Sequence, residues 1–189
     1  MKADVIIKKI KYSESADKIV IEYERRYKDK NPSYHISTFS EKAAPEFYEA
    51  LEKLTKPACN ILGLGALFLK RLKPHTVSYK YSEDGTMSAA ISCLLYSPRA
   101  DKDNNINVPL MRCPADETEA GQAGFFTQEE VDALWKLETE ARKYLDGKRN
   151  QIQLWSEEAT ADAQTDEPQQ INDVPPVKIS NVIPIPTIQ

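Results

Sequence analysis

The sequence is poor in the residues on which most enzymes depend. Its 189 residues include only two histidines, His35 and His75, and three cysteines, at positions 59, 93 and 113, that form no Cys-x-x-Cys pair. So few and such widely spaced ligands predict neither a zinc site nor a disulfide framework. No nucleophile is paired with a base in any recognisable motif. We therefore expect a protein that is not an enzyme and that uses no metal and no cofactor.

Long apolar runs are also missing. No run approaches the roughly 20 residues that a membrane-spanning helix needs, and the N-terminal residues alternate with charges where a signal peptide would have an apolar core. Unpaired cysteines suit a reducing compartment. These absences predict a cytoplasmic protein that does not associate with membranes.

An excess of charge is missing from most of the chain. Residues 1–150 hold 24 Lys and Arg against 23 Asp and Glu, whereas residues 151–189 hold one lysine and six acidic residues. The net charge of −4 therefore comes from the end of the chain. Because a neutral body does not attract polyanions by bulk charge, contact with nucleic acid would require a local basic patch.

Hydrophobic periodicity predicts an α+β protein. A helix is expected after Ser40, ending at Pro57. A second helix is expected from a Thr127–Glu130 capping box, with Trp135 on its apolar stripe and Gly147 at its end. Segments 98–105 and 113–126 are expected to be loops. Alternation of apolar and polar residues predicts strands at 3–12, 17–27, 34–39, 75–82, 87–96 and 106–111.

Two stretches of the sequence recur. Residues 11–14 (Lys-Tyr-Ser-Glu) return at 80–83, and residues 46–54 match residues 129–137 at five of nine positions. These matches predict a domain over residues 1–150 built from two pseudo-symmetric β-β-β-α repeats, residues 1–73 and 74–150, that share one core. The alternative is coincidence among residues that are common on helix surfaces.

One hairpin tip combines cations with aromatic rings. Arg25, Arg26, Lys28, Lys30 and Tyr34 form a candidate surface for single-stranded nucleic acid or phosphate, since single-strand binders join positive charge to stacking rings. The alternative is an ordinary solvated hairpin end. Further cations lie at residues 8, 9 and 11 and in a second cluster at residues 70, 71 and 73.

The peptide at residues 151–155 resembles the motif by which bacterial polymerases and repair proteins bind the sliding clamp. Gln151, Ile152, Leu154 and Trp155 match that motif, with Ile in place of Leu and Trp in place of Phe. The resemblance implies that this peptide docks on a bacterial sliding clamp, with Leu154 and Trp155 as apolar anchors. The alternative is that these two side chains fold back onto the body and cover the second helix.

The rest of the chain, residues 156–189, is predicted to be an acidic, proline-rich, flexible and extended tail. Residues 156–173 carry a single large aliphatic side chain and should be disordered in isolation. Residues 174–189 are rich in Val, Ile and Pro and could add a strand to a sheet edge. If that edge belongs to a neighbour, the tail would make a homo-oligomer.

The layout of residues 1–155 resembles small uncharacterised proteins of phages and prophages that are encoded near recombination and single-strand-binding genes. Segments 45–51, 77–82 and 144–149 carry this resemblance. Duplicated units of strands with one helix are also similar to the domains of sliding clamps, although the acidic helix at residues 46–52 argues against a role in encircling DNA.

The resemblance carries no established activity with it, and the leading hypothesis is a non-enzymatic phage accessory protein of DNA replication or recombination, acting in the cytoplasm of the bacterial host. It would dock on the host sliding clamp and contact DNA. The second hypothesis is an anti-defence protein of a phage, which would bind a nucleotide immune signal in a pocket between repeats or subunits.

Overall fold

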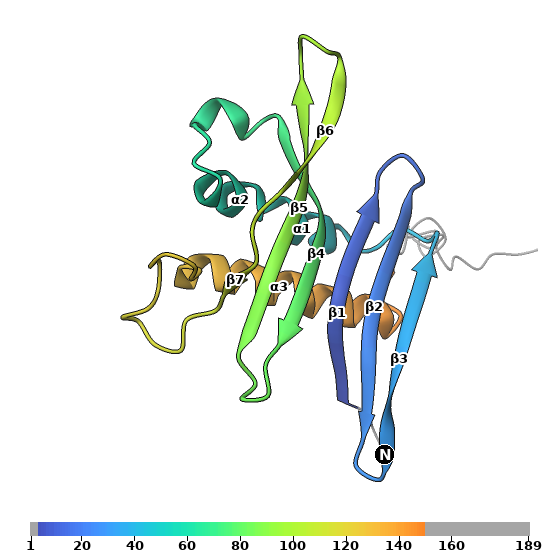
Figure 1. The fold of residues 1–189 in the computed structure, drawn as a ribbon. Helices are drawn as coiled ribbons and strands as arrows, with labels where there is room; N and C mark the ends of the chain where they lie inside the picture. The colour runs from blue at the N-terminus through green and yellow to red at the C-terminus, as the bar shows by residue number, and fades with distance from the viewer. Residues whose placement is uncertain (1–3, 150–189) are drawn as a thin grey trace, which may run out of the picture. The chain divides into compact units, whose positions relative to one another are not determined.

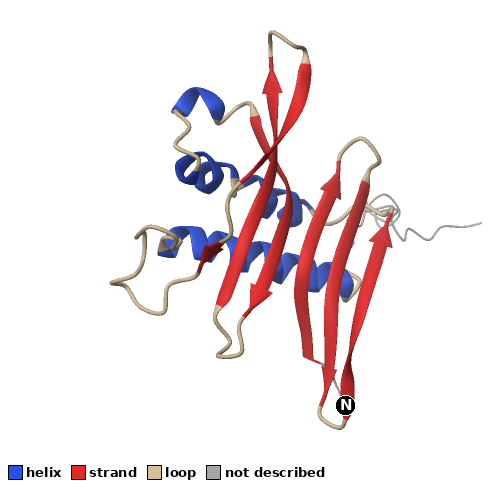
Figure 2. Ribbon diagram, viewed as in Figure 1, coloured by secondary structure: helices blue, strands red, loops and turns tan. Residues whose placement is uncertain are grey.

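The computed structural model describes residues 4–149. These residues fold into an antiparallel sheet with helices packed on one of its faces (Figures 1 and 2). The helices are α1 (Pro45–Glu52), α2 (Thr55–Ile61) and α3 (Gln128–Leu145), with a short 3₁₀ helix η1 (Ala66–Phe68). The strands are β1 (Asp4–Ser13), β2 (Lys18–Tyr27), β3 (Lys30–Phe39), β4 (Leu72–Tyr81), β5 (Met87–Ser97), β6 (Lys102–Asn107) and β7 (Met111–Arg112).

Two three-strand meanders lie side by side in the sheet. The strand order is β3-β2-β1-β4-β5-β6, and β7 pairs with β5. The meanders meet only where Lys9, Ile10 and Lys11 of β1 pair with Ser78, Val77 and Thr76 of β4. By contrast, β1 and β2 pair over nine residues. We call this short junction the β1–β4 seam.

The core lies between the sheet and the helices. Alternate side chains of β1, β2, β4 and β5 point to the helices, as the period of a strand requires. They pack against the apolar stripes of α1 and α3. Residues that are almost completely buried there include Ile7, Ile10, Ile21, Phe47, Leu54, Val77, Ile91, Leu134 and Tyr144.

Several predictions from the sequence are confirmed. The fold is α+β, and α3 begins with the expected capping box, in which Thr127 and Glu130 each bond the other's backbone N–H. Gly147 follows α3 with a φ of +104°, a left-handed value that favours glycine. No helix within residues 4–149 is long and apolar enough to cross a membrane.

The first predicted helix is wrong in its bounds. It divides into α1 and α2, and Pro57 lies buried in the first turn of α2 instead of ending the helix. The first turn tolerates proline because its N–H groups have no partner within the helix. Ala44, not Ser40, stands at the N-cap of α1 and provides no side-chain bond.

Two other bounds also differ. β3 starts at Lys30 and not at residue 34, because Pro32 lies on an edge strand that needs no N–H donor on its free side. The segment 98–105 is not a loop, since β6 occupies Lys102–Asn107, and this exposed edge strand lacks the apolar alternation by which strands are recognised. Pro109 falls between β6 and β7.

Trp135 is not part of the buried stripe of α3. Its side chain is 44% exposed, whereas Leu137 and Glu138 are buried. The buried face of α3 carries Val131, Leu134 and Glu138, and residue 135 lies just beyond it. The predicted stripe was one residue too wide on this side.

Candidate functional site

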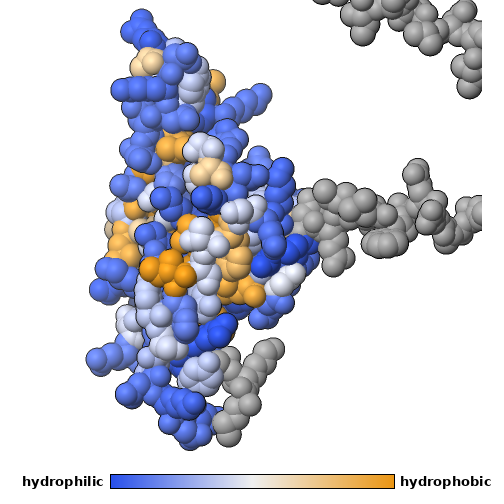
Figure 3. All heavy atoms as spheres, turned by 90° about the vertical axis from the view of Figure 1, so that its right-hand side faces the viewer, coloured by the Kyte–Doolittle hydropathy of each residue, from blue (hydrophilic) through white to orange (hydrophobic). Residues whose placement is uncertain are grey.

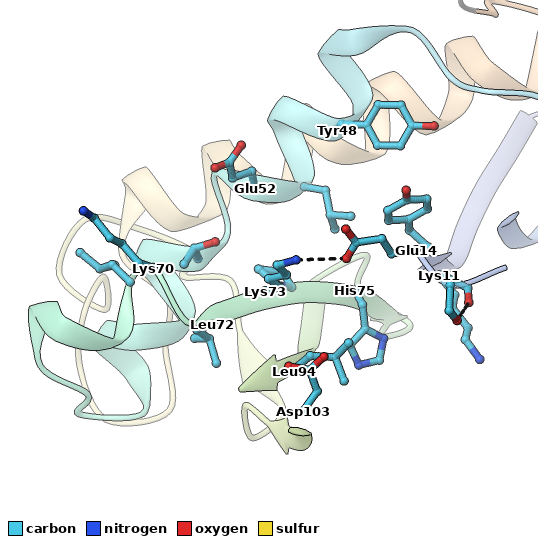
Figure 4. A pocket seen from close by; sticks show the side chains of 17 residues that line it. Lys11, Glu14, Tyr48, Glu52, Lys70, Leu72, Lys73, His75, Leu94 and Asp103 are labelled. Carbon is cyan, nitrogen blue, oxygen red and sulfur yellow. Dashed lines mark hydrogen bonds and ion pairs between the residues drawn. The ribbon is translucent and has the colours of Figure 1, made fainter. Parts of the chain in front are cut away.

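A cavity of about 710 Å³ opens where the β1–β4 seam ends. It lies between the end of β1 and the following turn, the start of β4, and helix α1 (Figure 4). We call it the seam pocket. Its lining consists of Lys11, Tyr12, Ser13, Glu14, Ser15, Tyr48, Leu51, Glu52, Thr55, Leu69, Lys70, Leu72, Lys73, Pro74, His75, Leu94 and Asp103.

Two tyrosines form an aromatic wall of the seam pocket. The rings of Tyr12 from β1 and Tyr48 from α1 meet edge to face, with centroids 5.2 Å apart. The hydroxyl of Tyr48 accepts a hydrogen bond of 3.2 Å from the backbone N–H of Ala43, which helps to fix the ring. Leu51 and Leu72 are buried beside them. The wall is therefore formed before any ligand arrives.

Charged side chains surround this wall. Lys73 Nζ lies 3.2 Å from a carboxylate oxygen of Glu14, and this ion pair joins the start of β4 to the β1–β2 turn (Figure 4). Both side chains are largely exposed, and such pairs contribute only about 0–1 kcal/mol. An anionic ligand could therefore replace Glu14 at little cost. The other charged lining residues are Lys11, Lys70, Glu52 and Asp103.

His75 lines the pocket, and both of its ring nitrogens lie within hydrogen-bond distance of a neighbouring side chain. Its Nε2 lies 3.1 Å from Asn105 Oδ1, and its Nδ1 lies 2.8 Å from the hydroxyl of Thr76. The amide oxygen requires the proton on Nε2, so Nδ1 accepts from Thr76. Burial, and the nearby charge of Lys11, hold the pKa of His75 below its usual value, against the effect of Asn105. Both ring nitrogens are thus engaged by neighbouring side chains.

The predicted basic hairpin does not form one patch. Arg25 lies over the ring of Tyr23, at 5.4 Å, on the face that carries the helices. Arg26 instead bonds Glu24 at 2.6 Å. Because successive residues of a strand point to opposite faces, the two guanidinium groups lie on different faces of β2.

The remaining predicted residues of this hairpin are exposed. Tyr34 donates a hydrogen bond from its hydroxyl to Glu22, which raises the pKa of Tyr34. Lys28 and Lys30 lie at the β2–β3 turn, and within residues 4–149 neither makes an ion pair. The predicted clamp-binding residues Gln151, Ile152, Leu154 and Trp155 lie outside the described residues.

The second cation cluster of the sequence contributes to the pocket only in part. Lys70 and Lys73 line it, but Arg71 turns away, since its guanidinium donates to the carbonyl oxygen of Tyr96 and lies over Phe68. The cluster was visible in the sequence. Its convergence with Lys11 of β1 was not, because that depends on which strands are neighbours.

Potential metal ligands and thiols are scattered through residues 4–149. No group of three or more His, Cys, Asp and Glu residues there could hold a metal ion. Burial raises the pKa of Cys93 to about 12 and that of Cys113 to about 11, so these thiols are poor nucleophiles.

No protein-family model, curated protein or solved structure matches the chain.

Proposed function

We propose that this chain is a non-enzymatic binding protein that holds a small anionic ligand with an aromatic ring, such as a nucleotide, in the seam pocket. The observation that carries this proposal is the meeting of the Tyr12–Tyr48 wall with three lysines around one cavity. Its volume lies within the range of about 300–1,000 Å³ that is typical of small-molecule sites. In the phage setting that the sequence resembles, the ligand would be a nucleotide immune signal.

The ring and the anion of such a ligand would have separate partners. The aromatic wall offers apolar surface and ring edges for a base. Lys73 would exchange its carboxylate partner Glu14 for a phosphate oxygen, and Lys70 would add a second cation. Because Glu14, Glu52 and Asp103 also line the pocket, a ligand of high negative charge is disfavoured. A mononucleotide or cyclic nucleotide fits this balance best.

We also propose that the two meanders arose by duplication, which would place the seam pocket between two repeats. The recurrence of residues 11–14 at 80–83 gives an offset of 69 residues. Lys9 pairs directly with Ser78, which is the residue 69 positions later. A pseudo-twofold axis through this pair would relate β1 to β4, and each meander is followed by a helix that packs on the same core.

A thermal-shift screen with cyclic and linear nucleotides tests the proposed binding. A ligand at 100 times its dissociation constant adds about 2.7 kcal/mol to the free energy of unfolding, which corresponds to about 5–10 °C in a chain of this size. The Lys70→Met/Lys73→Met variant should lose this shift. The matched control, Lys28→Met/Lys30→Met, removes the same charge at the β2–β3 turn and should keep it.

Two results would end the proposal. One is that no nucleotide raises the melting temperature of the wild type. The other is that both double variants lose the shift equally, since the effect would then follow net charge and not the pocket.

Docking on a bacterial sliding clamp is the second candidate function, and the anchoring of Arg149 favours it. The guanidinium of Arg149 bonds Glu41 at 2.6 Å and lies over the rings of Tyr144 and Phe39, at 4.0 and 4.9 Å. The chain is thus held to the body two residues before Gln151. In the sequence, the proposed motif thus begins two positions after an anchored residue.

The affinity of the chain for purified, immobilised sliding clamp tests this second function. The Leu154→Ala/Trp155→Ala variant should lose binding. Trp135→Ala, which removes an exposed indole from α3, is the matched control and should bind as the wild type does. Failure of the wild type to bind, or equal affinities for all three proteins, would exclude the clamp as a partner.

A further inference from the structure

The two edges of the sheet are unlike each other. Strand β6 at one edge carries Lys102 and Asp103, and Pro109 follows it. Such residues blunt an edge against pairing with another strand. Strand β3 at the other edge lacks this protection over residues 33–39, which contain no proline, no lysine, no arginine and no acidic residue. Within residues 4–149 no strand pairs with the outer side of β3, so this edge offers its backbone groups to a partner strand.

Exposed apolar side chains accompany this edge. Tyr34 is 57% exposed and Ile36 is 63% exposed, and both lie on the face of the sheet opposite the helices, next to Glu24 and Glu22 of β2. Seen from the β3 side, hydrophobic side chains interrupt an otherwise hydrophilic surface (Figure 3). An edge strand with such side chains is suited to pairing.

We propose that β3 binds a second copy of this chain, and that the two β3 strands pair antiparallel with Ile36 opposite its own copy. The unprotected run, residues 33–39, is centred on Ile36, so this register pairs the whole run with itself. Tyr34 of each copy then faces Thr38 of the other. Aromatic and β-branched pairs of this kind stabilise antiparallel strands by about 0.2–1 kcal/mol each.

The charges near the edge favour a second copy. Glu22 and Glu24 of β2 are the acidic residues behind the run, and each already pairs with a lysine of β1, Lys9 and Lys8, at 3.2 Å. These two glutamates therefore add no uncompensated negative charge beside the paired run. Since the contact uses the same surface on both copies and the β6 edge is blunted, association closes at a dimer and does not continue into a filament.

Sedimentation of the full chain over a wide concentration range tests this inference. The wild type should reach twice its monomer mass of 21.4 kDa. Ile36→Lys should remain monomeric, because it places two like charges at the dimer axis. Leu67→Lys is the matched control, since it makes the same change at a side chain that is 86% exposed on η1, and it should dimerise normally.

A disulfide test fixes the register. Directly opposed residues of antiparallel strands have Cα atoms about 4.5–5.5 Å apart, within reach of a disulfide. Ile36→Cys should therefore give a covalent dimer on oxidation. Thr38→Cys should not, because its copy would lie about 13 Å away along the paired strands. The native cysteines, being buried, do not compete.

Any of three results would overturn the inference: a wild type that stays monomeric, an Ile36→Lys variant that dimerises as the wild type does, or equal loss of dimer in Leu67→Lys. Equal cross-linking at positions 36 and 38 would refute the proposed register. None of these results bears on nucleotide binding in the seam pocket, so the two proposals can fail separately.

Discussion

Glu138 places a carboxylate inside the protein, and removal of its counterion should be costly. Its side chain is only 2% exposed. It accepts a hydrogen bond from Arg142, one turn later in α3, at 2.8 Å, and another from the Tyr81 hydroxyl of β4 at 3.2 Å. Burial and the charge of Glu138 both raise the pKa of Tyr81. Arg142→Met would leave this carboxylate without its cation.

The expected loss in free energy of unfolding depends on how exposed the side chains of Glu138 and Arg142 are. Breaking a fully buried ion pair costs about 3–5 kcal/mol, whereas an exposed pair contributes about 0–1 kcal/mol. Arg142 is 39% exposed, so water partly replaces its guanidinium. We therefore expect Arg142→Met to lower the free energy of unfolding by about 2 kcal/mol, an intermediate value. This loss corresponds to a fall of about 4–8 °C in melting temperature.

A double-mutant cycle separates the ion pair from packing. In a Glu138→Leu background the carboxylate is absent, and Arg142→Met should then cost less than about 1 kcal/mol. The free energies come from urea denaturation followed by circular dichroism. Lys56→Met is the matched control, because its partner Glu129 is exposed, and it should also cost less than about 1 kcal/mol.

Equal effects of Arg142→Met in the two backgrounds would refute this reasoning, since the pair would then contribute nothing. The same holds if Lys56→Met is as destabilising as Arg142→Met. In that case the burial of Glu138 would not matter.

Three further predictions concern stability and reactivity. Because the pKa of His75 is lowered in the folded protein, the unfolded chain binds more protons, and thermal stability should fall as the pH drops below about 6.5. His75→Gln should flatten that part of the pH profile, and an unchanged profile would contradict the assignment. Thr127→Ala breaks the capping box and should cost about 1 kcal/mol, measured by urea denaturation, with Thr118→Ala in the exposed loop as a near-neutral control. Cys93 and Cys113 should resist iodoacetamide at neutral pH until denaturant is added, so rapid labelling of the folded protein, detected by mass spectrometry, would be the contrary result.

The parts of the fold that depend on neighbours in sequence were predictable. The β1–β2 hairpin follows from the alternation of Ile19, Ile21 and Tyr23 with polar residues. The start of α3 follows from Thr127 and Glu130, whose spacing alone allows the reciprocal bonds. In both cases the determining contacts lie within a few residues of each other, and the pattern is therefore visible in the chain.

The seam pocket was not predictable for the opposite reason. Lys11 and Lys73 line it together, but they belong to different strands, and the sequence does not say that β1 and β4 are neighbours. Nor does it say that their pairing stops after three residues. At the predicted hairpin tip, by contrast, the strand alternation was visible in the sequence and already placed Arg25 and Arg26 on opposite faces of β2.

The β1–β4 seam also makes this protein easy to divide. Each meander and the helix that follows it are continuous in sequence, and the connection between α2 and β4 runs through a largely exposed segment, residues 62–71. A cut in that segment yields two pieces that each hold three long strands and part of the helical layer. The two pieces share one hydrophobic core, so we expect neither to bury its apolar face alone. The chain is therefore a suitable scaffold for a split reporter. In such a reporter the two pieces would rebuild the core only when fused binding partners bring them together.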